Sequence, residues 1–362
     1  MWKKINNILF FIGIVAIIVM FCSLDVGFEK IMEYIHQMGY WFAVVILFWG
    51  LLYVMNTFAW EVIISSSGGR KIPFHKLLEL MVTGFALNNT TPGGLMGGEA
   101  YRIMELSRYV STPQATSSVL LFSMMHVFSH FWFWITGIAA YIIYAVVYGI
   151  KINVHVQLIL LLSLIFCSGG IYLFLKGYRN GMILRLMRLI CGIPGFRRRG
   201  KRLTARYRGK IEKIDSQIAA LHNSNRKDFM RSFLLEYFGR ILQCFEILII
   251  LNLSGVGEGE GIGRFMYLYL CSLLILAFTS FFANLLGFLP LQLGGREGGF
   301  VMSVTQIGMT ADIGLFISMI CRLRELCWTT IGLLFMKICR KEAICTEAEK
   351  VGDLNQSNIL RI

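Results

Sequence analysis

Long apolar runs separated by short polar breaks extend over most of the chain. A helix that crosses a bilayer needs roughly 20 predominantly apolar residues, and several of the runs reach that length. The pattern therefore predicts an all-α polytopic membrane protein with about six to eight transmembrane helices. The run at 115–148 fits either one tilted helix or a helix with a bent end. The predicted spans lie at about 5–24, 39–64, 115–148, 154–175, from 229 onward, 265–289 and 311–336.

Composition and charge agree with a membrane protein and give its orientation. Hydrophobic residues make up 56% of the chain and charged residues 15%, against about 25% charged residues in a soluble domain. Nearly all of the net charge of +14 comes from residues 176–231, which hold sixteen Lys or Arg and three acids. Positive loops are retained on the cytoplasmic side, so we predict a cytoplasmic loop and no nucleic-acid binding. Arg70, Lys71 and Lys337 mark the same side, which places both termini in the cytoplasm and the protein in the inner (cytoplasmic) membrane.

The runs divide the chain into regions. Residues 1–340 form the predicted transmembrane domain, with halves at about 1–178 and 229–340 joined by a basic loop at 179–228. In that loop, Leu203, Tyr207, Ile211, Ile214 and Ile218 recur at helical spacing between basic residues. This pattern predicts an amphipathic helix on an anionic membrane surface, with a packed helix of a cytoplasmic subdomain as the alternative. Residues 341–362 are predicted to form a disordered cytoplasmic tail.

Neither the N-terminus nor the cysteines indicate a secreted protein. The first apolar run is followed by no small-x-small cleavage site, so we predict a retained first span. The nine cysteines are scattered without CxxC spacing, and they are predicted to be small hydrophobic residues rather than disulfides or metal ligands. We expect no metal and no cofactor.

The stretch NNTTPGGLMGGEAYR, residues 88–102, interrupts the apolar pattern. The apolar piece before it, 77–91, has only about 22 Å of helical length. We therefore predict a re-entrant hairpin, in which a half-helix enters the membrane, turns at 92–98 and leaves on a second half-helix at about 99–110. Irregular backbone at membrane depth requires surrounding protein or a hydrated cavity.

A second interruption, LPLQLGGREGGF from Leu289, matches the first. When Pro92 is set on Pro290, Gly97 falls on Gly295 and Glu99 falls on Glu297. A polar asparagine precedes each motif. Two interrupted segments in corresponding halves are the sequence pattern of a transporter site built from internal repeats. The side assignments make the halves inverted, and the two motifs are predicted to meet near the midplane. The asparagines are Asn88 and Asn89 in the first half and Asn284 in the second.

The charged residues of these motifs restrict how the helices face. One charge at the bilayer centre costs about 2.5–3.5 kcal/mol on insertion scales. The charged residues must therefore face the protein interior or a hydrated cavity, where an arginine suits a phosphate. Glu99 and Glu297 lie in the first turns of the second half-helices. Each either caps the backbone amides there, or contacts a polar headgroup or carries a proton through the membrane. The same restriction applies to Arg102, Arg296, Arg322, Arg324 and Glu325.

Four further residues within apolar sequence are ionisable. Glu236 and Arg240 lie four residues apart and are expected to pair along one helix face. His126 and His130 have the same spacing in the run at 115–148. A metal site would need a third ligand that the sequence does not show, so we predict interhelical hydrogen bonds for both histidines.

At its two motifs and at CRLRELCWTTIGLL, the chain resembles the flippase-like membrane family that includes the transmembrane region of lysylphosphatidylglycerol synthases. The resemblance extends over about residues 5–340 and rests on about thirty of them. Leu291 and Gln292 depart from it, since glycines are expected there. Some relatives carry a soluble aminoacyl-transferase domain after the membrane part; this chain ends at Ile362, so we expect at most the flipping activity to carry over.

The resemblance implies a substrate pathway and a function. It implies a flippase that moves the headgroup of a lipid or lipid-linked saccharide across the membrane, with an anionic or zwitterionic membrane lipid as the partner. Two alternatives remain, a membrane-embedded transferase and a non-transporting partner of a lipid-modifying synthase in the same membrane. The sequence shows no nucleotide-binding motif for the transferase. The predicted pathway residues are Asn88, Asn89, Pro92, Gly93, Gly94, Gly98, Glu99, Arg102, Asn284, Pro290, Gly294, Gly295, Arg296, Glu297 and Arg322.

Overall fold

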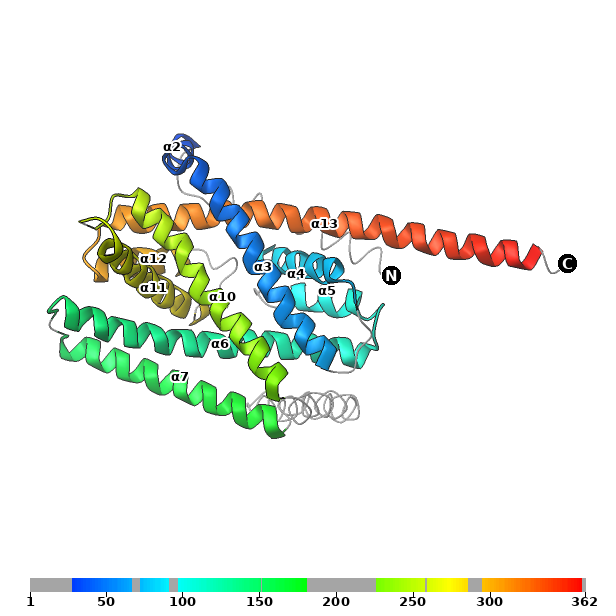
Figure 1. Cartoon of the computed structure of the whole chain (residues 1–362), viewed down its shortest axis with the longest axis horizontal. Helices are drawn as coiled ribbons and strands as arrows, with labels where there is room; N and C mark the ends of the chain where they lie inside the picture. The colour runs from blue at the N-terminus through cyan, green and yellow to red at the C-terminus, as the bar shows by residue number, and fades with distance from the viewer. Residues whose placement is uncertain are drawn as a thin grey trace, which may run out of the picture.

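A computed structural model describes the chain over residues 28–66, 72–90, 97–150, 152–180, 226–257, 259–285 and 295–359. In these ranges the regular secondary structure is helical, as the sequence predicts (Figure 1). The predicted first span, most of the basic loop with its amphipathic helix, and the turns of both motifs lie outside the described residues. The helices are α2 (Phe28–Met38), α3 (Tyr40–Ser66), α4 (Phe74–Thr90), α5 (Gly97–Leu106), α6 (Thr112–Val147), α7 (Val154–Asn180), α10 (Arg226–Leu253), α11 (Ile262–Leu285), α12 (Gly295–Gln306) and α13 (Ala311–Ile359).

Four of the described helices are long and apolar enough to cross a membrane: α3, α6, α7 up to Lys176, and α11. Helix α6 is continuous over 36 residues, so the run at 115–148 forms one helix. Helices α10, with 28 residues, and α13, with 49, are also long, but both carry charged residues within their apolar sequence. The architecture is that of a polytopic helical membrane protein.

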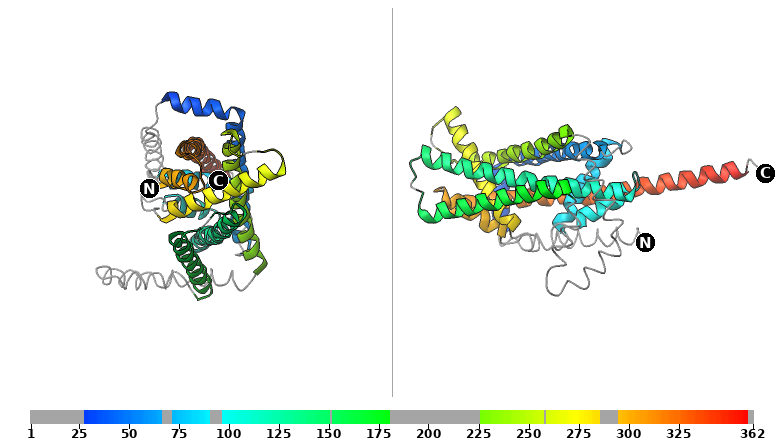
Figure 2. Two further views of the ribbon diagram at one scale, coloured as in Figure 1. Left: turned by 90° about the vertical axis from the view of Figure 1, so that its left-hand side faces the viewer. Right: turned by 90° about the horizontal axis from the view of Figure 1, so that it is seen from below.

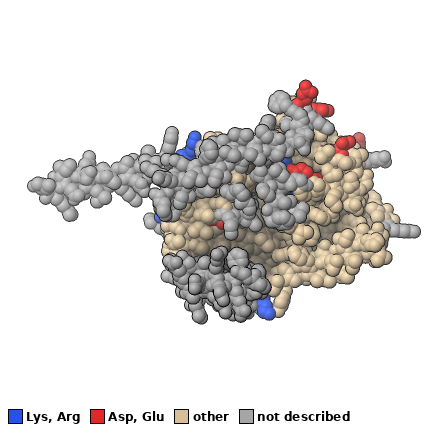
Figure 3. All heavy atoms as spheres, turned by 180° about the vertical axis from the view of Figure 1, so that it is seen from behind, with Lys and Arg blue, Asp and Glu red and all other residues tan. Residues whose placement is uncertain are grey.

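The outer surface of the bundle is apolar, as expected where lipid is the solvent. Helix α7 packs along α6 at the margin (Figure 1) and exposes Leu158, Ile159, Leu162 and Ile165. Seen from behind, the described surface is mostly uncharged and hollowed, with acidic and basic groups near its margins (Figure 3). Lipid tails solvate such side chains as well as a protein core does, so their exposure indicates membrane contact.

The interior contains two large apolar cores. The first joins α4 and α5 to the second half of α3, the middle of α13 and the first half of α6, around Trp60, Leu87 and Phe122. The second joins α10, α11 and α12 to the second half of α6 and the start of α13, around Ile247 and Phe300. Each core therefore includes residues of one helix that follows a motif turn, α5 in the first core and α12 in the second, and α6 and α13 take part in both.

Small residues let the helices approach closely at their crossings. A Cβ added to Gly332 of α13 would lie 2.6 Å from the Cβ of Ala86 on α4. A Cβ added to Gly314 of α13 would lie 2.7 Å from the Cα of Val301 on α12. Close approach through glycine and alanine is how helices associate where lipid removes the hydrophobic driving force. These contacts fix α13 against both α4 and α12.

The C-terminal region belongs to the last helix. Helix α13 continues to Ile359. Its last turns project away from the bundle (Figures 1 and 2). The segment KEAICTEAEK is rich in strong helix formers and has no proline, so the helix propagates from the packed part of α13.

Candidate functional site

The first motif begins the site with a glycine and an asparagine that join α4 to α5. The Gly98 amide donates to Asn88 Oδ1 at 2.8 Å, and Asn88 Nδ2 donates to Glu99 Oε1 at 3.2 Å. A side chain on Gly98 would collide with the Gly84 carbonyl oxygen. The Asn88 side chain therefore caps the Gly98 amide at the start of α5. The sequence had indicated the Glu99 carboxylate as a candidate for this cap. The other carboxylate oxygen of Glu99, Oε2, is buried and has no hydrogen-bond partner in the described part of the chain.

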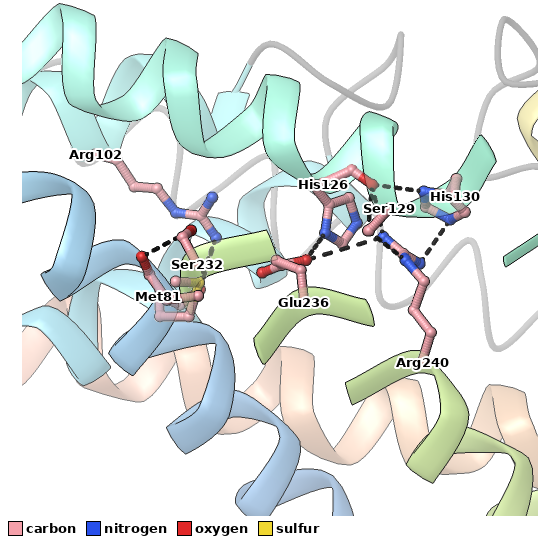
Figure 4. Close-up of polar contacts among 9 residues, drawn as sticks. Met81, Arg102, His126, Ser129, His130, Ser232, Glu236 and Arg240 are labelled. Carbon is pink, nitrogen blue, oxygen red and sulfur yellow. Dashed lines mark hydrogen bonds and ion pairs between the residues drawn. The ribbon is translucent and has the colours of Figure 1, made fainter. Parts of the chain in front are cut away.

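Arg102, one turn further along α5, is buried between α4, α3 and α6. Its Nη2 donates to the Met81 carbonyl at 3.0 Å, and its Nε lies 3.4 Å from the Leu80 carbonyl (Figure 4). Its guanidinium carbon lies 5.9 Å from the centre of the Trp60 ring and 5.8 Å from that of Phe122. Arg102 thus faces the interior, as the cost of a lipid-facing charge requires.

The second motif forms an ion-pair network between α12 and α13. Arg322 donates to Glu297 Oε1 from Nε at 2.8 Å and from Nη2 at 2.7 Å. Arg322 Nη1 also lies 3.6 Å from Glu325 Oε2, and Arg296 pairs with the other oxygen of Glu325. Two arginines and two glutamates alternate, so the charges balance. We call these four residues the α12–α13 network.

A neighbouring pair on α13 and α10 is more deeply buried. Arg324 Nε donates to Glu246 Oε1 at 2.9 Å, and both side chains are 1% exposed. Trp49 of α3 donates its indole N–H to Glu246 Oε2 at 2.8 Å. Arg324 Nη1 and Nη2 are buried and have no hydrogen-bond partner among the described residues. Within the described residues, the Arg324–Glu246 pair therefore uses only Nε of the guanidinium and leaves Nη1 and Nη2 without an acceptor.

A third polar group joins α6 to α10 and is called here the α6–α10 cluster: His126, Ser129 and His130 of α6 with Glu236 and Arg240 of α10. His126 Nδ1 lies 2.8 Å from Glu236 Oε2 (Figure 4). Arg240 donates to Ser129 Oγ at 2.7 Å and contacts His130 Nε2 at 2.8 Å. The predicted pairing of Glu236 with Arg240 is present at 4.0 Å, and the predicted interhelical bonding of both histidines is confirmed.

The other predicted pathway residues have different outcomes. Asn284 is exposed and its amide donates to the Ser280 carbonyl on its own helix, so no described contact joins it to the motif charges. The buried amide nitrogen of Asn89 has no hydrogen-bond partner among the residues that the structure describes, and Gly295 is the first residue of α12. Among the described contacts, none joins the first motif to the second, so a shared chamber remains a prediction. Pro92, Gly93, Gly94, Pro290 and Gly294 lie outside the described residues.

The structure adds residues that were not in the predicted pathway. Arg324, Glu325 and Glu246 follow from the same rule that placed Arg322, since each is a charge within apolar sequence. Trp49 and Tyr53 of α3 carried no such signal. The Tyr53 hydroxyl is buried and no described residue forms a hydrogen bond with it, and the Tyr53 ring centre lies 4.7 Å from that of Trp328 on α13. Across the described residues, no three His, Cys, Asp or Glu side chains are placed to hold a metal ion.

Comparison with known proteins assigns the chain to a family. The family model described as "Lysylphosphatidylglycerol synthase TM region" matches residues 8–332. The match covers both motifs, all three polar groups and most of the chain. No curated protein and no solved structure matches the chain.

Proposed function

The chain belongs to the family of the lysylphosphatidylglycerol synthase TM region, and from this premise we propose that it moves the polar headgroup of a lipid or lipid-linked saccharide across the membrane. Membership of the family supports a membrane protein of lipid metabolism or transport. The observation that carries the more specific proposal is the unsatisfied guanidinium of Arg324, buried at the junction of α3, α10 and α13.

An unpaired buried donor is costly, and a ligand that accepts from it recovers that cost. Leaving a buried donor unsatisfied costs about 1–3 kcal/mol, and more when the group is charged. Nη1 and Nη2 of Arg324 present two parallel N–H groups, the geometry that matches a phosphate or carboxylate. The guanidinium carbon lies 3.6 Å from the centre of the Trp49 ring, which fixes the plane of the fork. Arg324 is therefore the best candidate to hold an anionic headgroup.

The surrounding charges suit a headgroup in passage better than one bound permanently. The α12–α13 network has two guanidiniums, and each already shares a carboxylate. An anion that enters beside Arg322 exchanges one ionic partner for another, so neither its arrival nor its departure leaves an arginine bare. Sites that conduct must bind strongly enough to admit a ligand and weakly enough to release it.

Helix packing supports two related halves. Helix α4 packs on α5 and on α13, while α11 packs on α12 and on α6. Helices α3 and α10, which precede α4 and α11, pack against each other. If α4, α5 and α6 correspond to α11, α12 and α13, each of α4 and α11 packs on the next helix of its own half and on the last helix of the other half. A twofold relation between the halves produces this arrangement. We propose that the motifs following α4 and α11 enter from opposite faces, as in transporters built from inverted repeats.

Reconstitution tests the proposal. The full chain is placed in vesicles with a fluorescent lipid, and a membrane-impermeant quencher reports how much lipid reaches the outer leaflet. Three headgroups are compared: an anionic glycerophosphate, a zwitterionic phosphoethanolamine and a neutral sugar without phosphate. We expect faster exchange than in protein-free vesicles for the phosphate-bearing lipids. Exchange equal to protein-free vesicles for all three lipids would refute transport, and exchange of the neutral sugar lipid alone would refute the role of the arginines.

A further inference from the structure

The α6–α10 cluster lies apart from the ion pairs assigned to the headgroup. We propose that His126 and Glu236 form a proton-binding site, and that uptake of one proton there favours an anion at the neighbouring arginines. The proton site stands on the geometry of the cluster. Its effect on transport rests on the function proposed above.

Arg240 fixes the protonation of His130. A guanidinium has only donors, so Arg240 Nη1 donates to His130 Nε2 at 2.8 Å and this nitrogen carries a lone pair. The ring proton of His130 is then on Nδ1, which donates to the His126 carbonyl at 3.1 Å. Arg240 also donates to Ser129 Oγ and, at 2.9 Å, to the same His126 carbonyl. His130 is therefore held neutral and takes no part in proton exchange.

His126, in contrast to His130, is placed to exchange a proton. Its Nδ1 lies 2.8 Å from Glu236 Oε2, and its side chain is 46% exposed whereas that of Glu236 is 1% exposed. No described residue forms a hydrogen bond with its Nε2. An ionisable ring facing hydrocarbon would be costly, so the accessible edge is expected to border a hydrated opening. The ring thus connects water to a buried acid whose second oxygen, Oε1, has no hydrogen-bond partner within the described ranges.

The proton transfer balances in two steps. A proton from water binds His126 Nε2, which makes the ring an imidazolium. The Nδ1 proton then passes to Glu236 Oε2, which leaves a neutral ring with its proton on Nε2 and a neutral carboxylic acid. One proton has been taken up, and the charge of the pair has changed from −1 to 0. The reverse steps release it.

The groups around the pair explain why the proton matters. Arg240 Nη2 lies 4.0 Å from Glu236 Oε2, and Arg102 of α5 interacts electrostatically with both Glu236 and His126. The nearby contacts of α3 are the Ala59 carbonyl, which accepts from Ser232, and Asn56, so they supply no titratable group. Further titratable neighbours are two phenols, Tyr237 bonded to Thr136 and Tyr269 bonded to the Ile241 carbonyl, together with the neutral His130. Arg102 also interacts electrostatically with Glu99 of α5 and Tyr53 of α3.

Arg240 therefore depends on Glu236 for compensating negative charge, and Arg102 is compensated by Glu236 together with Glu99. Protonation removes that charge and leaves Arg102 and Arg240 with one acid fewer, so an anion is held more tightly. By thermodynamic reciprocity, a bound anion favours proton uptake to the same extent. A single titrating site changes the bound fraction by at most about tenfold per pH unit. Headgroup binding is thus expected to strengthen as pH falls through the titration of the pair.

Infrared difference spectroscopy of the full chain in lipid tests the proton site without measuring transport. Spectra are taken between about pH 5 and about pH 9, the range in which a histidine-linked site is expected to titrate. Acidification is expected to produce a protonated-carboxyl band that Glu236→Gln removes. Glu79→Gln, which alters an acid paired with Lys76 outside the cluster, is expected to retain the band. A wild-type spectrum identical to that of Glu236→Gln would overturn the proposal.

Two histidine variants keep the test decisive if Glu236→Gln does not fold. His126→Gln removes the ring that carries the proton and is expected to lose the pH dependence of lipid exchange. His130→Gln keeps an acceptor for Arg240 and is expected to retain it. Exchange by His126→Gln with the wild-type pH dependence would overturn the proposal. Absence of exchange by the wild-type protein would instead refute the proposed function, while the infrared band would still decide the proton site.

Discussion

Arg324 of α13 stacks on Trp49 of α3, with its guanidinium carbon 3.6 Å from the ring centre, and both residues hold the carboxylate of Glu246. Three helices from both halves of the chain thus meet at one buried charge pair. A buried pair that loses one member leaves an uncompensated charge, which costs more than the intact pair contributes. This junction is therefore important for both folding and the interior charge balance.

Removing the acid of this junction should destabilise the fold. Glu246→Gln leaves Arg324 without its carboxylate, and breaking a buried pair costs about 3–5 kcal/mol. We expect a clearly lower midpoint of thermal unfolding in detergent. The matched control is Glu61→Gln, on α3, whose backbone carbonyl accepts from Ser65 and whose carboxylate has no part in the junction. Equal midpoints for the two variants would contradict the structural importance of the pair.

Glycine at position 84 is required by Arg102. A Cβ at Gly84 would overlap the Arg102 guanidinium, and overpacking costs about 1–3 kcal/mol. Gly84→Ala is expected to lower the unfolding midpoint. Gly169→Ala, in helix α7 with no atom near the added Cβ, is expected to be neutral or stabilising because alanine favours the helix. A Gly84→Ala protein as stable as the Gly169→Ala protein would show that Arg102 is not held where the structure places it.

The bond between Arg322 and Glu297 should appear as coupling energy. Because the two side chains share two short contacts, the effects of Arg322→Gln and Glu297→Gln on unfolding should not add. Interacting residues show coupling of about 0.5–3 kcal/mol in a double-mutant cycle. The cycle of Arg322→Gln with Glu79→Gln provides the additive reference. Additivity within error in both cycles would contradict the α12–α13 network.

The first motif should be needed for headgroup movement but not for insertion. Losing a hydrogen bond to a charged group costs about 1.5–3 kcal/mol, or roughly ten- to hundredfold in rate when the bond is made only during passage. Glu99→Gln and Arg102→Ala are therefore expected to reduce lipid exchange by at least about tenfold, with normal amounts of protein in the membrane. Unchanged exchange by both variants would remove the first motif from the pathway.

The sequence was sufficient for several of the long apolar helices and for a contact within one helix, but it did not predict the short helix α2. Apolar runs located α3, α6, α7 and α11, and the four-residue spacing of Glu236 and Arg240 predicted their pairing. It was also sufficient to predict that His126 and His130 bond across helices. In each case the signal is local, because periodicity and the cost of a charge in lipid act on neighbouring residues.

Contacts between distant helices could not be predicted in the same way. The partner of His126 is Glu236, which is 110 residues away, and that of Trp49 is Glu246, 197 residues away. Such pairs depend on how each helix is rotated in the bundle, which apolar spans with nearly uniform faces do not specify. The interaction of Gly98 with Asn88 was missed for a related reason, since it depends on how closely α5 approaches α4.

Lipid exchange by an Arg324 variant tests the central claim most directly. Arg324→Lys keeps the charge but loses the fork, and it is compared in vesicles with Arg108→Lys, which alters a partly exposed arginine paired with Glu105. We predict that Arg324→Lys exchanges a phosphate-bearing lipid at least about tenfold more slowly than wild type, while Arg108→Lys matches wild type. Wild-type exchange by folded Arg324→Lys protein would contradict the claim that this guanidinium holds the headgroup.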